Sequence, residues 1–158
     1  MLKIALPLAM AFAGSLASAA EQDPSASSPA ATGPAQATAS AEESVRAIVA
    51  TVRRQLGDSA ELFGLLVILR VRPGQIDRVL ASYALQKAQA DANSGNLLYH
   101  VSWNAADPEQ IVVYERWSGF DAFRRHETSP DTLAHFVRVA ASLENQRSLT
   151  VLLDRQSR

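Results

Sequence analysis

The chain has 158 residues, of which 47% are hydrophobic and 20% are charged, and its formal net charge is −1. This balance is typical of a globular domain and shows no basic stripe of the kind that nucleic-acid-binding proteins use, so no nucleic-acid partner is expected. Cysteine is absent, which excludes disulfides, thiolate metal ligands and cysteine nucleophiles.

The N-terminal segment, residues 1–20, has the features of a cleavable signal peptide. Lys3 supplies a positive charge, residues 4–12 are apolar, and residues 17–19 form a small Ala-Ser-Ala cleavage site. The apolar run is too short to span a bilayer as a stable helix, although a signal anchor is the alternative interpretation. We therefore expect an exported protein, secreted or periplasmic, without stable membrane insertion after cleavage.

The next segment, residues 21–40, is rich in alanine, serine and proline and is predicted to be a disordered linker, because it has little to bury. Ser40 and Glu43 have the spacing of a capping box, which predicts that order begins there. An amphipathic helix is predicted over residues 41–57, ending at Gly57. Its apolar stripe is expected to pack on the following domain, with a partner or membrane surface as the alternative.

A folded domain is predicted over residues 62–153, followed by a polar tail at 154–158. Alternating and helical periodicities indicate strands at 62–72, 97–103, 111–117 and 149–153, and helices at 75–93, 120–126 and 130–145. This order predicts an α+β fold of the ferredoxin-like, split βαβ type, a four-stranded antiparallel sheet with helices on one face. The other sheet face is also apolar, so two sheets are expected to pack together in a homodimer.

The helix predicted at 130–145 begins with a Ser129 cap and Pro130 at its first position. Its spacing places His135 opposite the apolar stripe, so His135 is expected in solvent. The residues expected on the inward face are Leu133, Phe136, Val137 and Ala140.

Several short motifs resemble, in order and spacing, those of antibiotic biosynthesis monooxygenase domains. They are Val71-Arg72-Pro73-Gly74, Asn96-Leu97-Leu98-Tyr99, Asp107-Pro108, Tyr114-Glu115-Arg116-Trp117, His126 and Ser129-Pro130. The resemblance covers residues 62–153 and implies a domain that dimerises into an α+β barrel. Members of this family include monooxygenases that oxidise quinols and polyphenols with O2 without a cofactor; others degrade haem, and many have no established activity.

The resemblance also implies a ligand cavity between the helices and the sheet face that carries Glu115 and Trp117. The residues expected to line it for a small aromatic or quinol-like ligand are Trp117, Tyr99, Tyr83 and Phe123. His126 is the predicted base, because the ordinary pKa of histidine lies near neutrality, and Glu115 is predicted to orient it or to stabilise its charged form. The alternative is structural, with Glu115 paired to a nearby arginine and Trp117 a core aromatic.

No metal or bound cofactor is predicted. His100, His126 and His135 fall on different predicted elements without the spacing of metal ligands. Haem-degrading relatives carry an asparagine on the first strand, where this chain is apolar before Arg70. The resemblance therefore implies a cofactor-independent monooxygenase acting on a quinol or polyphenol; the alternative is a non-catalytic periplasmic small-molecule-binding or stress-related protein of the same fold.

Overall fold

The computed structural model describes residues 33–58 and 61–153, apart from the side chains of residues 145 and 146. The predicted signal peptide, most of the predicted linker and the tail lie outside the described residues. The elements are α1 (Pro34–Leu56), β1 (Phe63–Val71), α2 (Ile76–Asp91), β2 (Asn96–Asn104), β3 (Asp107–Trp117), α3 (Phe120–Glu127), α4 (Pro130–Val139), the short 3₁₀ helix η1 (Ala140–Ser142) and β4 (Leu143–Leu153).

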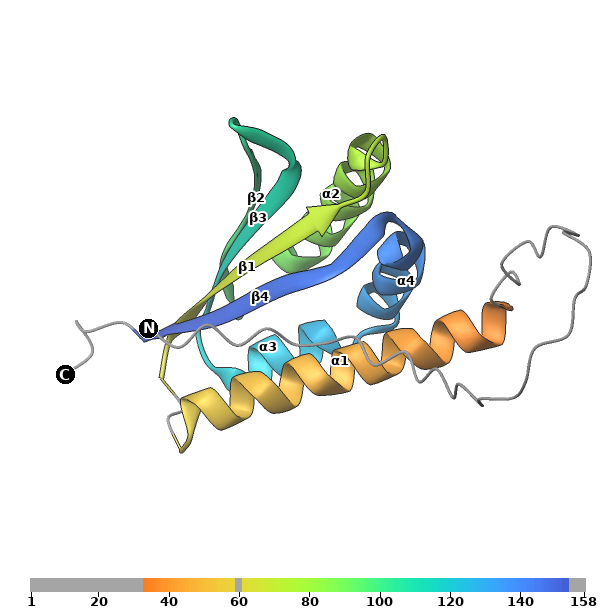
Figure 1. Ribbon diagram of the computed structural model, residues 1–158. Coiled ribbons are helices and arrows are strands. Elements are labelled where there is room, and N and C mark those ends of the chain that lie inside the picture. The colour runs from red at the N-terminus through yellow and green to blue at the C-terminus, as the bar shows by residue number, and fades with distance from the viewer. Residues whose placement is uncertain (1–32, 59–60, 154–158) are drawn as a thin grey trace, which may run out of the picture.

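The sheet is antiparallel throughout, with the strand order β2-β3-β1-β4. The central strand β1 pairs Val67 with Val113 of β3 on one side and with Leu149 of β4 on the other. Figure 1 shows the helices gathered on one side of the sheet, with α1 running beneath α3 and α4. The predicted α+β, ferredoxin-like fold with an additional N-terminal helix is confirmed.

Two groups of buried apolar side chains join the sheet to the helices. One lies under α2 and includes Val71, Val79 and Ile111. The other lies under α1 and α3, and in it Val52 and Leu56 of α1 pack with Trp117. Burying one such large side chain contributes about 1.5–3 kcal/mol. The helix α1 therefore packs on its own domain.

The start of α1 differs from the prediction. The helix begins at Pro34, where the side-chain oxygen of Gln36 accepts a hydrogen bond from the Gly33 amide at 3.2 Å. Proline suits the first helical position because it needs no amide partner there, and the alanine-rich residues that follow favour helix. Ser40 thus lies inside the helix, and the predicted capping box there is wrong. The predicted end at Gly57 is confirmed, with a φ of 59°.

The boundary between α4 and β4 also differs. The predicted helix at 130–145 stops at Val139, and β4 begins at Leu143 instead of residue 149. Leu143 pairs with Val71, and Arg147 pairs with Leu69. Residues 143–147 are mostly polar and lack β-branched side chains. They form a strand because pairing with β1 satisfies backbone groups on both strands, and this outweighs their local preference.

The predicted orientation of α4 is wrong. Its buried residues are Thr132, His135 and Val139, whereas Ala140 is exposed and the other residues predicted to face inward, Leu133, Phe136 and Val137, are half-buried. His135, expected in solvent, is 3% exposed. Its Nδ1 lies 2.9 Å from the Ser82 hydroxyl of α2. The helix therefore packs against α2 through a polar face. The apolar periodicity predicted the wrong buried face because it does not detect buried polar side chains.

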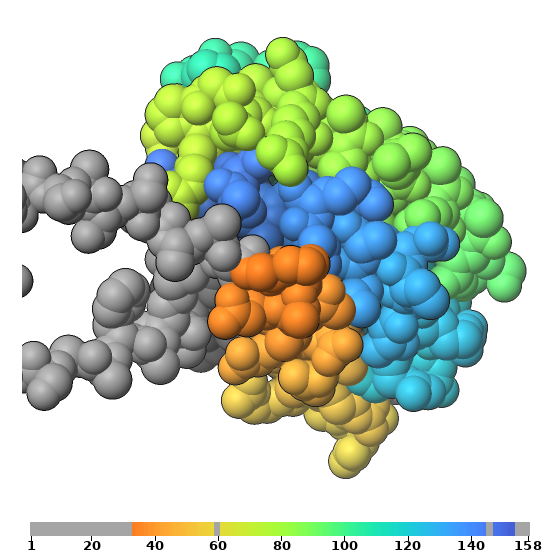
Figure 2. Space-filling model, turned by 90° about the vertical axis from the view of Figure 1, so that its right-hand side faces the viewer, coloured from red at the N-terminus to blue at the C-terminus, as the bar shows by residue number. Residues whose placement is uncertain are grey.

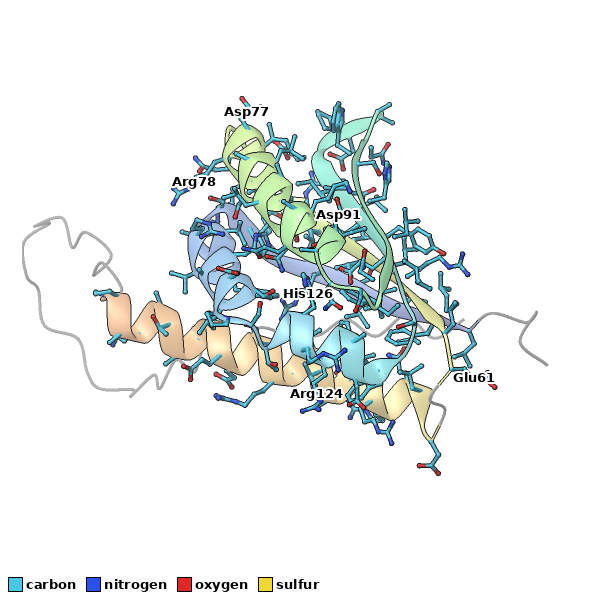
Figure 3. All side chains as sticks on the ribbon, turned by 180° about the vertical axis from the view of Figure 1, so that it is seen from behind. Glu61, Asp77, Arg78, Asp91, Arg124 and His126 are labelled. Atoms are coloured by element: carbon cyan, nitrogen blue, oxygen red, sulfur yellow. The ribbon has the colours of Figure 1, made fainter. Side chains whose placement is uncertain are left out.

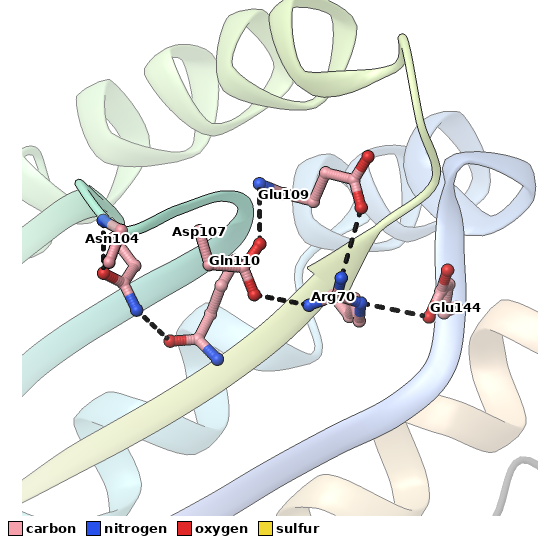
Figure 4. A network of polar contacts seen from close by, with 7 residues as sticks. Arg70, Asn104, Asp107, Glu109, Gln110 and Glu144 are labelled. Carbon is pink, nitrogen blue, oxygen red and sulfur yellow. Dashed lines mark hydrogen bonds and ion pairs between the residues drawn. The ribbon is translucent and has the colours of Figure 1, made fainter.

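Arg70 of β1 links the two strands on either side of it, β3 and β4 (Figure 4). Its guanidinium contacts Asp107 at 2.5 Å and Glu109 at 3.2 Å, both at the start of β3, and Glu144 of β4 at 3.5 Å. All four side chains are about one-third exposed, so water screens these contacts. We interpret the network chiefly as fixing strand register.

Gly95 brings the segment before β2 against α3. A Cβ atom at this position would lie 2.2 Å from the Cβ of Ala122 and 3.0 Å from the Ser118 hydroxyl. The absence of a side chain therefore permits α3 to sit close to the sheet.

Candidate functional site

A cavity of about 60 Å³ lies between the sheet and the helices. All four strands and all four α-helices contribute to its wall, with α1 supplying Ile48. The wall is apolar on much of its surface, and Tyr83 and Tyr99 also line it. Its other polar residues are Gln86, Glu115, Glu127, Thr132, His135 and Arg147.

The sequence-predicted residues divide into two groups. Tyr83, Tyr99 and Glu115 line the cavity. Trp117, Phe123 and His126 are buried behind its wall. Figure 3 shows His126 within the molecule between α3 and the sheet, whereas Arg124 of the same helix points outward. Glu115 and Trp117 lie on the helix-covered sheet face, as the alternation along β3 predicted.

Glu115 is held by Trp117. The indole Nε1 of Trp117 donates a 2.8 Å hydrogen bond to Glu115 Oε2. Burial raises the pKa of Glu115 to about 7, and the indole hydrogen bond acts in the opposite direction. The structural alternative paired Glu115 with a nearby arginine. Arg124 of α3 is not that partner, because it contacts Asp121 instead.

Glu127 is a second buried carboxyl group, at the end of α3. Its Oε2 has no hydrogen-bond partner among the described residues. Burial raises its pKa to about 8; Glu115 adds to this shift and Arg147 opposes it. Two carboxyl groups thus line one cavity and titrate near neutrality, where each disfavours the charged form of the other.

Gln86 connects His126 to the cavity. The Thr132 hydroxyl donates its one hydrogen to the His126 carbonyl at 2.7 Å. Its oxygen therefore accepts from Gln86 Nε2, which lies 2.6 Å away. The same Gln86 nitrogen lies 3.0 Å from His126 Nε2, which must therefore be the acceptor. Burial lowers the pKa of His126 to about 4. At neutral pH the ring is thus neutral, with its proton on Nδ1.

The aromatic rings around His126 fix its position. Its ring centroid lies 5.0 Å from that of Trp117 and 5.9 Å from that of Tyr99. Phe123 packs against Phe63 at 5.8 Å and Trp117 at 5.9 Å. Phe123 therefore supports the wall from the core.

Arg147 of β4 brings a positive charge to the cavity. No hydrogen bond or ion pair joins its guanidinium to another described residue. Burial lowers its pKa, while Tyr83 and Glu127 act in the opposite direction. Arginine stays protonated under such conditions, so the cavity wall carries a cation that no carboxylate of the described residues contacts directly.

Sequence reasoning missed Gln86, Glu127, Thr132 and Arg147, and it misplaced His135. A signal existed for Gln86, because it interrupts the apolar stripe of α2 at helical spacing from Val79 and Tyr83. Arg147 had no such signal, because the polar residues 144–147 were assigned to a helix end and a loop.

Among residues 33–58 and 61–153, no three His, Asp or Glu side chains are grouped so as to hold a metal ion. In the same part of the chain, no helix combines the length and apolar character needed to cross a membrane.

Residues 63–138 match the family model of antibiotic biosynthesis monooxygenases. This segment is an antibiotic biosynthesis monooxygenase (ABM) domain. No curated protein matches the chain significantly.

Solved structures with the ABM fold resemble this chain at low sequence identity. A protein from Nitrosomonas europaea is 16% identical, with a TM-score of 0.59 over 63% of this chain and 95% of its own. Rv0793 from Mycobacterium tuberculosis is 23% identical, with a TM-score of 0.56 over 61% of this chain and 100% of its own. SnoaB from Streptomyces nogalater, a cofactor-independent oxygenase studied as a mutant, is 19% identical, with a TM-score of 0.55 over 62% of this chain and 97% of its own.

These similarities show the fold. They also show that this chain is longer than the ABM domain alone, because the matched structures are covered almost entirely by about three-fifths of it. The family model begins at residue 63, after α1. The cavity wall therefore contains a helix from outside the matched domain.

Proposed function

We propose that this protein is an exported monooxygenase that binds a small phenolic or quinol-type ligand in the ABM cavity and oxidises it with O2 without a bound cofactor. The observation that carries the proposal is the pair of buried carboxyl groups, Glu115 and Glu127, in a cavity lined by Tyr83 and Tyr99. Export rests on residues 1–20. The N-terminal sequence of the mature protein would test it.

The chemistry requires removal of a proton from a phenolic hydroxyl group. A base is most effective when its pKa lies near the working pH, and the pKa values of Glu115 and Glu127 are raised to about 7 and 8. The carboxylate takes the proton, and the electron pair of the O–H bond stays on the phenolate, which can then reduce O2. One oxygen atom of O2 enters the product and the other leaves as water, with two hydrogens from the substrate.

Oxygen consumption with a panel of hydroquinones and catechols tests this proposal. Glu115→Gln and Glu127→Gln keep the shape of the side chain and remove the base, so one of them is expected to lower the rate by about 100-fold or more. Glu43→Gln, on the exposed face of α1, is the matched control. The same assay also tests the prediction from the sequence that His126 is the base. If wild type and His126→Ala consume O2 equally fast, that prediction is wrong.

A non-catalytic binding protein is the alternative, because Glu115, Trp117 and His126 all have partners within the fold. This alternative predicts that an aromatic ligand binds in the cavity and that O2 consumption stays at the level of the buffer. Calorimetric titration of the same panel separates it from the monooxygenase.

We also propose a homodimer that forms through the sheet face opposite the helices. Leu66, Ile68, Val112 and Tyr114 lie in adjacent register there, and none of them is fully buried. At the rim of this face, Leu98 is 41% and Leu152 is 38% exposed. A second copy would remove this apolar surface from water.

Light scattering at micromolar concentration is expected to give twice the mass of one chain. Ile68→Glu, which places a charge in the centre of this face, is expected to give monomers. A wild-type monomer that does not aggregate would contradict the proposal.

A further inference from the structure

A second cavity lies under the N-terminal half of α1. Its volume is about 60 Å³, and α1 contributes Ser40, Ala41 and Ser44 to its wall. The opposite wall comes from α4, η1 and β4. Figure 2 shows this half of α1, in orange, lying directly beside the blue C-terminal part of the chain.

The two cavities are neighbours. Leu69, Phe136 and Arg147 line both of them. We name the cavity with Glu115 and Glu127 the inner chamber and the cavity under α1 the outer chamber. The side chains of Phe136 and Arg147 thus stand at the junction between the chambers, and α1 contributes to the walls of both.

Two hydrogen-bond acceptors in the wall of the inner chamber lack a donor among the described residues. Glu127 Oε2 and Gln86 Oε1 are buried, line this chamber, and have no hydrogen-bond partner among the described residues. Buried polar atoms are nearly always paired, so such atoms in a cavity wall indicate a ligand or water that donates to them. Hydroxyl groups on an aromatic ring would supply these donors.

The junction between the chambers holds a hydrogen-bond donor, the Arg147 guanidinium, that lacks an acceptor among the described residues. The Arg147 guanidinium makes no hydrogen bond or ion pair to a described residue, although it lies at the boundary of both chambers. The acidic residue of the outer chamber, Glu144, is instead contacted by Arg70 at 3.5 Å. A planar guanidinium in this state is suited to bind a carboxylate through two parallel hydrogen bonds.

We infer that α1 extends the ABM cavity into a two-chamber site for an aromatic acid. The hydroxylated ring lies in the inner chamber, where it donates to Glu127 and Gln86. The carboxylate side chain reaches the junction and binds Arg147 beneath α1. This inference rests on the proposed function only in taking a hydroxylated aromatic ring as the ligand of the inner chamber.

The test compares catechol with 3-(3,4-dihydroxyphenyl)propanoate, which carries the same ring and adds a short carboxylate arm. Both are titrated anaerobically by calorimetry, so that binding is measured without turnover. Because the charged contact is made in a largely buried site, the acid is expected to bind wild type at least about tenfold more tightly than catechol. Arg147→Gln is expected to abolish this preference, so that the acid binds the variant no more tightly than catechol does.

The contribution of α1 is tested with Ala41→Phe, which fills the outer chamber from the helix side. This variant is expected to lose the preference for the acid while it still binds catechol. Ala50→Phe, on the exposed side of the same helix, is the matched control and should retain the preference. Where Ala41→Phe lowers the melting temperature strongly, Arg147→Gln alone decides the outcome.

Equal affinity of wild type for the two ligands would overturn the inference and leave the proposed function standing. A preference for the acid that survives Arg147→Gln would also overturn it. Failure of both ligands to bind would contradict the inference together with the ligand class of the proposed function.

Discussion

At the scale of single residues, the site depends on side chains whose environment shifts their ordinary chemistry. Glu115 and Glu127 hold protons at a pH where exposed carboxyl groups have lost them, and His126 stays neutral where an exposed histidine begins to gain one. Burial is the main cause in each case. The residues able to exchange protons near neutrality are therefore the carboxyl groups.

Replacement of Trp117 by phenylalanine tests the cause of the Glu115 shift. The indole hydrogen bond favours the charged carboxylate, so Trp117→Phe is expected to raise the pKa of Glu115 above about 7. Carboxyl carbon chemical shifts followed by NMR against pH measure this change. Trp103→Phe, at a position 59% exposed, is the control and should leave the titration unchanged. A Glu115 pKa that stays the same or falls would contradict the assignment.

Much of the fold was predictable from the sequence because its strands and helices follow clear periodicities. Glu115 and Trp117 were assigned to the correct sheet face from alternation alone, and Ser129 caps α4 as predicted. His135 was misplaced because its helix buries polar side chains, which an apolar pattern does not detect. Glu127 and Arg147 join the site through tertiary packing of α3 and β4, which no local pattern in the sequence reports.

At the scale of elements, α1 is part of the domain core. Val52 and Leu56 are buried among residues of the sheet and α3, the Arg53 guanidinium lies 5.2 Å from the Phe120 ring centroid, and Gln55 accepts a hydrogen bond from the Val151 amide. These contacts are all in the C-terminal half of the helix. The N-terminal half instead covers the outer chamber with small side chains.

Truncation of a core residue of α1 tests this account. Val52 is fully buried, so Val52→Ala is expected to lower the free energy of unfolding by about 1–3 kcal/mol, because it removes apolar contact and leaves a cavity. Val49→Ala, at a half-buried position one turn earlier, should cost less. Urea unfolding followed by circular dichroism measures both. Equal and negligible losses would show that α1 is not part of the cooperative core.

At the scale of the whole molecule, the buried groups give the stability a defined pH dependence. The pKa values of Glu115 and Glu127 are raised, so the native state retains protons that the unfolded chain loses above about pH 4.5, and stability falls as pH rises toward 8. The pKa values of His126 and His135 are lowered to about 4, so stability falls as pH drops from 6.5 toward 4.

Between about pH 4.5 and 6.5 the two effects oppose each other, so the stability of wild type is expected to be nearly constant there and to decline on both sides. Glu127→Gln is expected to flatten the alkaline decline, making the variant more stable than wild type at pH 9 by about 1–3 kcal/mol. The urea midpoint measured across this pH range provides the test. An unchanged alkaline decline in Glu127→Gln would show that Glu127 ionises normally in the native state.

The close approach of Gly95 to Ala122 links a position outside the site to the placement of α3. The atom that a methyl group at position 95 would strike belongs to the helix that carries His126 and Glu127. Gly95→Ala is expected to displace α3, which contributes Glu127 to the wall of the inner chamber. The position of Glu127 in the chamber wall thus depends in part on a residue that does not line the chamber.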